Sequence, residues 1–367
     1  MTKPVAVDIH AHYVPERFLA IVDDAGQASG ARVDRSSPAG PVIELKGSRT
    51  VPLDATYWDL DRRVKAMDRA GVDVHALSLT APMVYFADGP VGARLARAVN
   101  DAMDAAHTAY PERFVGCATL PMQDPKLALD ELERVGRLGG IRAVYLGTNV
   151  SGRDLSEPDF APIFARCEAL RLPVLLHPLT VIGAARLAKF YLNNFLGNPF
   201  DTAVAAAHLV FGGVLDRHPR LEVCLPHAGG ALPYLVGRLT HGQRVRPETK
   251  GVARRPFERY LRRFTYDTIT HSPALLKFLI DTVGADRVML GSDYCFDMGY
   301  TRPVDASPDA SASAGPTSAA SSAPPPPACS SSVEDRRHGR AGVAPAGRGR
   351  TRHLTLEGTS VQRYAIT

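Results

Sequence analysis

Five residues of types that bind metal ions or transfer protons stand at the ends of apolar segments. The segment VDIHAH (7–12) carries His10 and His12, PVLLH ends at His177, and two further apolar runs lead into His227 and Asp293. Imidazole nitrogens and a carboxylate oxygen form a ligand set that suits Zn²⁺ and leaves one position for a water molecule. The HxH pair alone is a weak signal, because a histidine after a strand is more often an ordinary polar residue. Five such residues in equivalent places favour a metal site.

Eight apolar, β-branched segments recur through the chain, and amphipathic helical patterns lie between them. We predict strands over 5–12, 72–80, 114–121, 142–149, 173–178, 221–230, 264–269 and 287–296. Near-continuous apolar runs are typical of parallel strands that are covered on both faces. Seven helices are predicted over 58–71, 92–114, 124–140, 159–172, 201–219, 231–243 and 272–284. This alternation favours an α/β fold, a (β/α)8 TIM barrel, over an open doubly wound sheet.

The barrel would bring the five residues together. Residues i and i+2 of a strand point to the same face, so His10 and His12 project side by side. In a (β/α)8 barrel the carboxyl ends of all strands meet at one face, where active sites lie. We therefore expect the five residues to converge there.

Two parts of the chain depart from this alternation. Residues 13–56 include PAGPVIELKGSRTVPL, which predicts a small β excursion after the first strand, interpreted as a cap over the barrel mouth. From 304 onward Pro, Ser, Ala and Arg predominate, a composition that cannot bury enough apolar surface to order a chain. We predict a barrel over 1–303 with a cap insertion at 13–56. We expect a disordered, low-complexity tail over 304–367 in place of the final barrel helix.

The bulk composition is that of a soluble globular protein, with 45% hydrophobic and 22% charged residues among 367. We find no apolar leader and no run approaching 18 apolar residues, so we expect neither secretion nor a membrane span. The five cysteines are scattered without CxxC spacing, which fits a cytoplasmic protein and no thiolate zinc site. Of the net charge of +5, residues from 301 onward carry +3, from eight Arg against five Asp or Glu. A nucleic-acid-binding surface is therefore not expected of the main body.

Several motifs resemble a known family. The segments DIHAHYVP, LLHP, LPHAGGALPYLVGRLTHG and MLGSDYCF resemble the amidohydrolase superfamily (amidohydrolase-related family 2). The likeness is greatest to its decarboxylase branch, represented by 2-amino-3-carboxymuconate-6-semialdehyde (ACMS) decarboxylases, and it extends over roughly residues 5–300. The resemblance implies one metal ion, Zn²⁺ or another divalent ion such as Mn²⁺, on His10, His12, His177 and Asp293. The fourth strand, RAVYLGTN, has no Lys or Glu to bridge a second ion.

The same resemblance implies the catalytic and substrate-binding residues. His227 matches the histidine that activates the metal-bound water, and Asp293 matches the aspartate that delivers a proton in relatives acting on aromatic acids. Arg238, in VGRLTHG, matches an arginine that reaches a substrate carboxylate in the neighbouring subunit, which would require a homodimer. Arg49 matches the family's other carboxylate-binding arginine. Guanidinium groups hold carboxylates by paired hydrogen bonds.

These residues lead to one expected function and two alternatives. We expect a Zn-dependent, non-oxidative decarboxylase of a small unsaturated or aromatic carboxylic acid. One alternative is a hydrolase of a lactone or amide that uses the same metal site. The other is a non-catalytic chain whose basic tail binds a polyanion. Leu179 stands where ACMS decarboxylases place a Trp, and DYCF replaces DYPF, so a muconate-like and a phenolic substrate both stay open.

Overall fold

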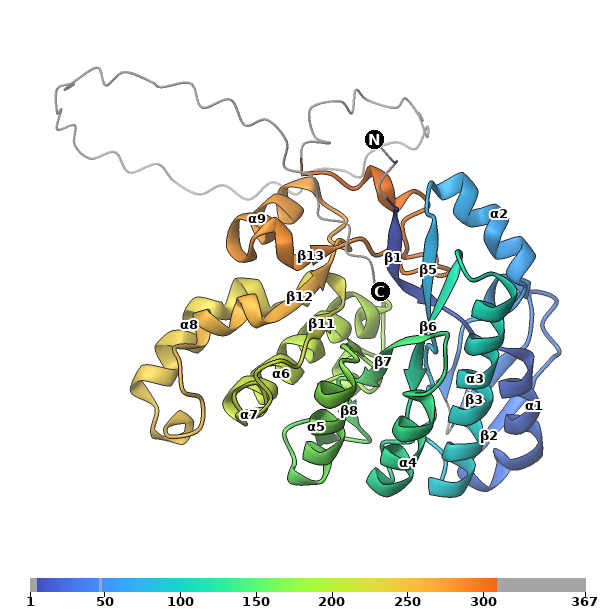
Figure 1. The fold of residues 1–367 in the computed structure, drawn as a ribbon, viewed down its shortest axis with the longest axis horizontal. Coiled ribbons are helices and arrows are strands. Elements are labelled where there is room, and N and C mark those ends of the chain that lie inside the picture. The colour runs from blue at the N-terminus through green and yellow to red at the C-terminus, as the bar shows by residue number, and fades with distance from the viewer. Residues whose placement is uncertain (1–4, 46–47, 309–367) are drawn as a thin grey trace, which may run out of the picture.

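The computed structural model describes residues 5–45 and 48–308 of the chain (Figure 1). Its centre is an eight-stranded parallel sheet in the order β1-β5-β6-β7-β10-β11-β12-β13. The strands span β1 Val7–His12, β5 Val74–Ser78, β6 Phe114–Thr119, β7 Ile141–Gly147, β10 Val174–His177, β11 Val223–Leu225, β12 Phe264–Asp267 and β13 Val288–Met289. Each lies within one residue of a predicted segment, and they follow one another around the sheet in chain order.

The sheet closes between its first and last strands. The Ile9 N–H donates to the Leu290 carbonyl at 3.0 Å, and the Asp293 N–H donates to the His10 carbonyl at 2.9 Å. An isolated parallel bridge joins Ala11 to Tyr294. The regular part of β13 is therefore only two residues long, but the backbone after it remains hydrogen-bonded to β1 as far as Tyr294. These bonds confirm the predicted (β/α)8 barrel.

Helices cover the outside of the barrel, as the amphipathic patterns predicted (Figure 1). They are α2 Leu60–Ala70, α3 Gly89–Ala109, α4 Pro125–Val135, α5 Ala161–Leu170, α6 Asn198–Phe211, α7 Val214–Arg217, α8 Leu232–Val245 and α9 Pro273–Val283. The side chains of Asp59, Asp88, Asp124 and Ser272 accept backbone N–H groups at four of the helix starts. The segment predicted as one helix over 201–219 is divided into α6 and α7 at Gly212 and Gly213, where Gly213 has φ 70°.

The excursion after β1 contains a helix as well as the predicted β structure. Helix α1, Glu16–Ala25, buries Phe18 and Val22 and lies beside α3 (Figure 1). It is followed by an antiparallel sheet of β2 Ala31–Asp34, β3 Val42–Leu45 and β4 Ser48–Arg49. A second small pair, β8 Asn149–Val150 and β9 Arg153–Asp154, follows β7. The interpretation of 13–56 as a cap stays a prediction.

After β13 the described chain contains the bridge at Tyr294, turns and one 3₁₀ helix, Pro303–Asp305, and it has no further α-helix up to residue 308. The predicted tail over 304–367 lies almost wholly outside the described residues. Within them, no helix is long and apolar enough to cross a membrane. Four cysteines of the described part are free thiols: Cys117, Cys167, Cys224 and Cys295.

Candidate active site

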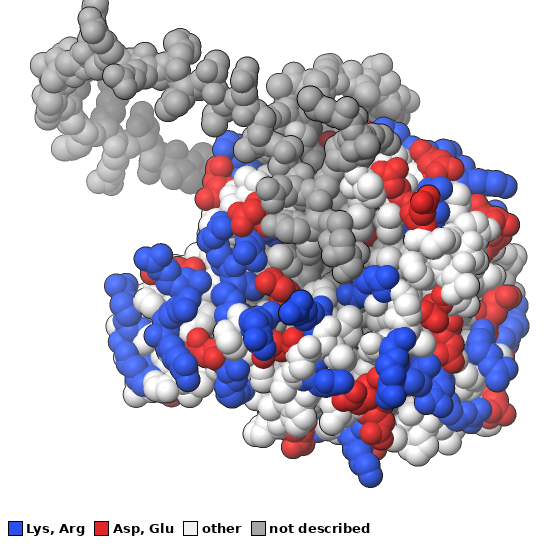
Figure 2. Space-filling view, viewed as in Figure 1, with Lys and Arg blue, Asp and Glu red and all other residues white. Residues whose placement is uncertain are grey.

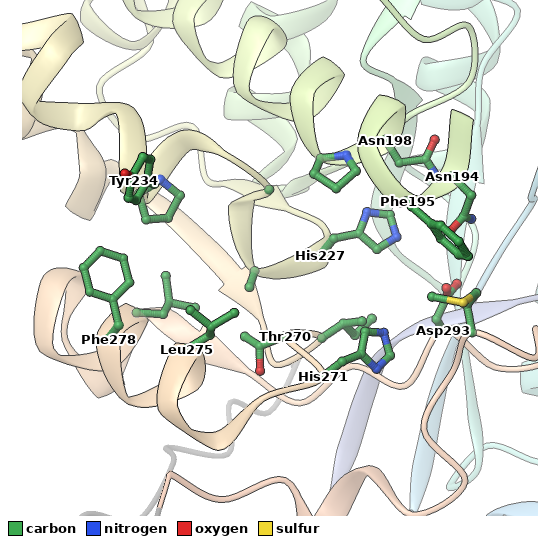
Figure 3. Close-up of a pocket in the computed structure, with 17 residues that line it drawn as sticks. Asn194, Phe195, Asn198, His227, Tyr234, Thr270, His271, Leu275, Phe278 and Asp293 are labelled. Carbon is green, nitrogen blue, oxygen red and sulfur yellow. The ribbon is translucent and has the colours of Figure 1, made fainter. Parts of the chain in front are cut away.

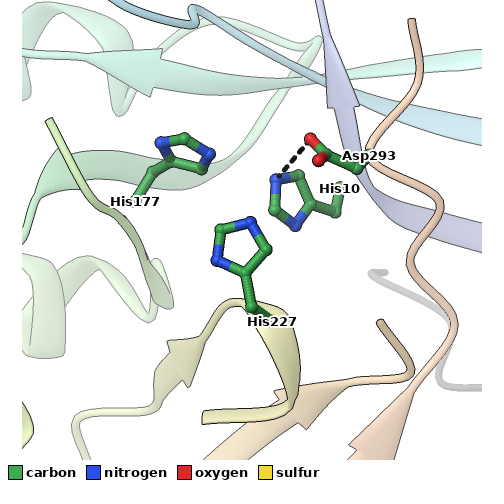
Figure 4. Close-up of side chains that lie close together, drawn as sticks. All are labelled: His10, His177, His227 and Asp293. Carbon is green, nitrogen blue, oxygen red and sulfur yellow. Dashed lines mark ion pairs between the residues drawn. The ribbon is translucent and has the colours of Figure 1, made fainter. Parts of the chain in front are cut away.

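The strand ends bring the five predicted residues into one cluster. Figure 4 shows four of them: His10, His177, His227 and Asp293. The His10 ring centroid lies 5.0 Å from that of His12, 5.3 Å from that of His177 and 5.4 Å from that of His227. One ligand atom each from His10, His177, His227 and Asp293 lies within 4.8 Å of all the others. The barrel thus assembles side chains that are far apart in the sequence, as the strand-end positions predicted.

Asp293 contacts both histidines of β1. Its Oδ1 atom lies 3.0 Å from His12 Nε2 and 3.5 Å from His10 Nε2. All three side chains are almost completely buried. A cluster of three or four imidazoles around one carboxylate is a common ligand set for a divalent transition-metal ion.

Hydrogen bonds outside the cluster orient two of the imidazoles. His10 Nδ1 lies 2.8 Å from Asp267 Oδ2, and His177 Nδ1 lies 2.8 Å from the Pro178 carbonyl. Both partners are acceptors, so each ring carries a hydrogen on Nδ1 and, in its neutral form, presents the lone pair of Nε2. His10 Nε2 is buried and has no hydrogen-bond partner among the described residues. Buried nitrogens with free lone pairs in one cluster are what a metal ion requires, so the residues fit a metal.

Asp267, at the end of β12, organises the site without belonging to the cluster of ligand atoms. Its carboxylate accepts the backbone N–H of His227 at 2.9 Å and of Ala228 at 2.7 Å, in addition to His10 Nδ1. One buried carboxylate therefore fixes both the His10 ring and the turn that carries His227. Asp267 lies within the strand predicted over 264–269 and was not among the predicted site residues. Its place at a predicted strand end, like the five others, was the available signal.

Burial and neighbouring charges shift the pKa values of the clustered side chains in different directions. Burial lowers the pKa of His227 and His177, and it lowers that of His12 to about 4. Burial also acts to lower the pKa of His10, but the hydrogen bond to Asp267 and the charge of Asp293 outweigh it, and the pKa is raised. Burial acts to raise the pKa of Asp293, but the hydrogen bond from His12 and the nearby imidazoles hold it well below the usual range. Burial acts to raise the pKa of Asp267 too, but the hydrogen bond from His10 and the nearby imidazoles together outweigh it, and the pKa is lowered. Asp267 and Asp293 are therefore both ionised at neutral pH.

A cavity of about 720 Å³ opens beside the cluster (Figure 3). His227 and Asp293 line it, whereas His10, His12 and His177 are not among its lining residues. Its other walls are mainly apolar, with a few polar side chains: Asn194, Phe195, Asn198, Pro199, Ala228, Gly230, Pro233, Tyr234, Ile269, Thr270, His271, Leu275, Phe278, Leu279 and Met298. The size and the apolar walls suit a small organic ligand held at one end by a few polar groups.

The two predicted arginines lie apart from the cluster. Arg49 is in the antiparallel sheet, with a side chain 54% exposed, and it pairs with Asp34 and with Glu44. Arg238 is exposed on α8, one turn after Tyr234. Neither lines the cavity of the single chain. Their roles in substrate binding stay predictions.

Comparisons with known proteins place this fold and site in a family. The profile of the amidohydrolase family matches residues 7–319. The chain is 32% identical to 2-amino-3-carboxymuconate-6-semialdehyde decarboxylase of Dictyostelium discoideum over 305 residues, which cover 82% of this chain and 84% of the relative. It is 34% identical to a gamma-resorcylate decarboxylase of Polaromonas over 256 residues, 65% of this chain and 77% of the relative.

A solved structure of a decarboxylase has a similar fold. The dihydroxybenzoic acid decarboxylase of Polaromonas, with bound manganese and the inhibitor 2-nitroresorcinol, matches with a TM-score of 0.66 at 27% identity. The match covers 81% of this chain and 88% of that one. The chain therefore belongs to the amidohydrolase family, among the metal-dependent carboxy-lyases that these relatives represent.

Proposed function

We propose that the chain is a non-oxidative decarboxylase that uses one divalent metal ion and acts on a small unsaturated or aromatic carboxylic acid. The observation that carries the proposal is the buried His/Asp cluster at the strand ends, open on one side to a mainly apolar cavity. Decarboxylases among the relatives support the reaction type. Relatives that act on muconate-like and on phenolic acids leave both substrate classes within the proposal.

The proposed ligands are His10, His12, His177 and Asp293. The contact of His12 with Asp293 and the unpartnered Nε2 of His10 support this set. The grouping of ligand atoms within 4.8 Å of one another contains His227 in place of His12, and we assign His227 to proton transfer because it lines the cavity. Zn²⁺ suits the nitrogen and oxygen donors, and the manganese of a solved relative makes Mn²⁺ the second candidate. When bound, such an ion polarises an oxygen ligand and lowers the pKa of a coordinated water to about 7 in the best-known zinc sites.

His227 is the proposed proton carrier, because it lines the cavity together with Asp293. Loss of CO₂ leaves an electron pair on carbon, so the site must deliver a proton to that carbon. Burial lowers the pKa of His227, which keeps the imidazole neutral at pH 7 and able to accept and pass on a proton. Asp293 is the alternative proton carrier for an aromatic substrate: because it is ionised at neutral pH, its carboxylate would first accept a proton and then pass it to the carbon.

We also propose a homodimer that completes the cavity. Two aromatic side chains that line the cavity are exposed, Tyr234 at 85% and Phe195 at 48%. Exposed apolar patches of this kind often mark protein interfaces. A second copy on this surface would let Arg238 of the partner subunit approach the substrate carboxylate. Lys and Arg side chains also gather over α8 (Figure 2), which would favour the approach of an anionic acid. A cytoplasmic location is proposed from the free cysteines.

The proposal is tested by incubating Zn²⁺- and Mn²⁺-loaded protein with a panel of unsaturated and aromatic carboxylic acids and measuring released CO₂. The same protein is offered a panel of lactones and amides. We expect metal-dependent CO₂ release from at least one acid, and its loss in His227→Gln. Hydrolysis of a lactone or amide without CO₂ release would replace the proposal by the hydrolase alternative. Salt-sensitive polyanion binding that is lost when residues 301–367 are deleted, with no turnover, would favour the non-catalytic alternative.

A further inference from the structure

We propose that Asp8 is a positioning residue, which holds the candidate metal ligands of the first and last strands in place. The inference rests on the proposed metal site, but it concerns a residue outside the ligand set and outside the substrate cavity. Asp8 lies on β1, two residues before His10, and it is completely buried. Two strands that carry candidate ligands meet at this side chain.

The Asp8 carboxylate joins β1 to the segment after β13. Its Oδ1 atom accepts the backbone N–H of His10 at 3.0 Å and the backbone N–H of Ser292 at 3.0 Å. Its Oδ2 atom accepts the hydroxyl hydrogen of Ser292. The Ser292 hydroxyl oxygen in turn accepts the N–H of Tyr294 at 3.0 Å. The carboxylate thus holds the residue before Asp293 directly and the residue after it through one hydroxyl.

The backbone on both sides needs such support. β1 and β5 lose register between Asp8 and Ala11, where β1 has one residue more than its partner. This bulge surrounds His10, whose N–H turns to Asp8. On the other strand, Asp293 has φ 62°, a conformation that residues other than glycine rarely adopt unless the surroundings hold it. Both irregular residues are candidate ligands, and the Asp8 carboxylate bonds to the backbone beside each.

The contacts predict which substitutions are tolerated. Asp8→Asn keeps an oxygen that can accept both backbone N–H groups, and the Ser292 hydroxyl can rotate to accept from the new amide. Asp8→Ala removes every acceptor. A positioning role therefore predicts that Asn preserves metal binding and Ala does not.

Asn100→Ala is the matched control. Asn100 is also completely buried, and its amide bonds to both the N–H and the carbonyl of Thr119 at the end of β6, where no candidate ligand lies. Its loss should reduce stability without changing metal affinity.

The experiment measures Zn²⁺ affinity by chelator competition and the visible absorption spectrum of Co²⁺-loaded protein, on variants whose circular dichroism shows a folded chain. We expect Asp8→Ala to bind Zn²⁺ about 10- to 100-fold more weakly and to alter the Co²⁺ spectrum, as is typical when a group that orients ligands is removed. The Zn²⁺ affinity of Asp8→Asn should stay within about threefold of that of the parent protein. A folded Asp8→Ala with parental affinity and spectrum would overturn the inference.

A second variant covers the case in which Asp8→Ala does not fold. Ser292→Ala removes a single hydroxyl, and we expect roughly 2- to 10-fold weaker Zn²⁺ binding, the equivalent of one hydrogen bond. Unchanged affinity in Ser292→Ala would then reject the positioning role. A parent protein that binds no metal would instead reject the proposed function, so the two failures are distinguishable.

Discussion

Asp267→Asn should lower the metal affinity of the site strongly while lowering the free energy of unfolding of the barrel only slightly. In the parent protein, Asp267 Oδ2 accepts from His10 Nδ1 and the His227 N–H, and Oδ1 accepts from the N–H groups of Ala228 and Ile269. An asparagine amide must place its NH₂ group at one of these two positions. Each placement opposes a donor to at least one backbone N–H.

The preferred orientation of the new side-chain amide is the one that leaves fewer backbone N–H groups without an acceptor. With NH₂ at the Oδ1 position, two backbone N–H groups lose their acceptor. With NH₂ at the Oδ2 position, only the His227 N–H loses its acceptor, provided that His10 Nδ1 becomes an acceptor. A buried unpaired N–H costs about 1–3 kcal/mol, so the second orientation is favoured. His10 must then carry its hydrogen on Nε2, the nitrogen that faces the cluster.

We therefore expect Asp267→Asn to lower the free energy of unfolding by only about 1–3 kcal/mol. Its metal affinity should fall about 10- to 100-fold, because the wrong nitrogen of His10 is protonated. The assays are urea unfolding of the metal-free protein, chelator competition for Zn²⁺, and the ¹⁵N spectrum of the His10 ring, which distinguishes the two tautomers. Asp267→Ala should destabilise more, by about 3–5 kcal/mol.

Asp201→Asn is the matched control. Asp201 is a buried carboxylate on α6 whose partners are Thr148, Asn149 and the Ile182 N–H. The Asp201→Asn variant should lose a similar amount of unfolding free energy, with no change in metal affinity. Parental metal affinity in Asp267→Asn, or a His10 ring that keeps its hydrogen on Nδ1, would refute the reasoning.

Three further predictions concern pH, catalysis and assembly. The pKa of His12 is lowered to about 4 and those of His177 and His227 are also lowered, so at these three groups the unfolded chain binds more protons as pH falls from about 6.5 to 4. Asp8 acts in the opposite direction below about pH 6, because burial raises its pKa to about 6. We expect the three rings to outweigh the one carboxyl, so the metal-free protein should lose stability over this range in urea titrations; a flat profile would contradict the buried neutral rings. His227→Ala should retain its metal ion but release CO₂ at least about 100-fold more slowly, in parallel metal and turnover assays; equal turnover would exclude it as proton carrier. Tyr234→Asp should shift the protein from dimer to monomer in sedimentation experiments, since a charge would enter the exposed aromatic rim, and a parental sedimentation profile would place the interface elsewhere.

The barrel and the convergence of the cluster followed from the sequence because each is encoded locally. Eight apolar runs separated by amphipathic segments specify parallel strands covered by helices, and the position after each run specifies the catalytic face. His177 and Asp293 could be placed near His10 without knowledge of any contact between them. The prediction needed only the strand ends.

What the sequence left open depends on contacts between distant segments. The role of Asp267 requires knowledge that its carboxylate meets His10, 257 residues away, as well as the backbone after β11. Asp8 looked like an ordinary strand residue, because the bulge that turns the His10 N–H toward it is a property of the closed sheet. Helix α1 was missed within 13–56, where the β-like run at 38–53 dominated the interpretation.

The most direct test of the account is the metal content of the purified protein, measured by elemental analysis beside Asp293→Ala. We expect about one Zn²⁺ or Mn²⁺ per parent chain and a clear loss in the variant, since a carboxylate ligand contributes charge as well as a bond. A folded parent that holds no divalent metal after incubation with either ion, or an Asp293→Ala chain that holds as much as the parent, would contradict the proposed metal site.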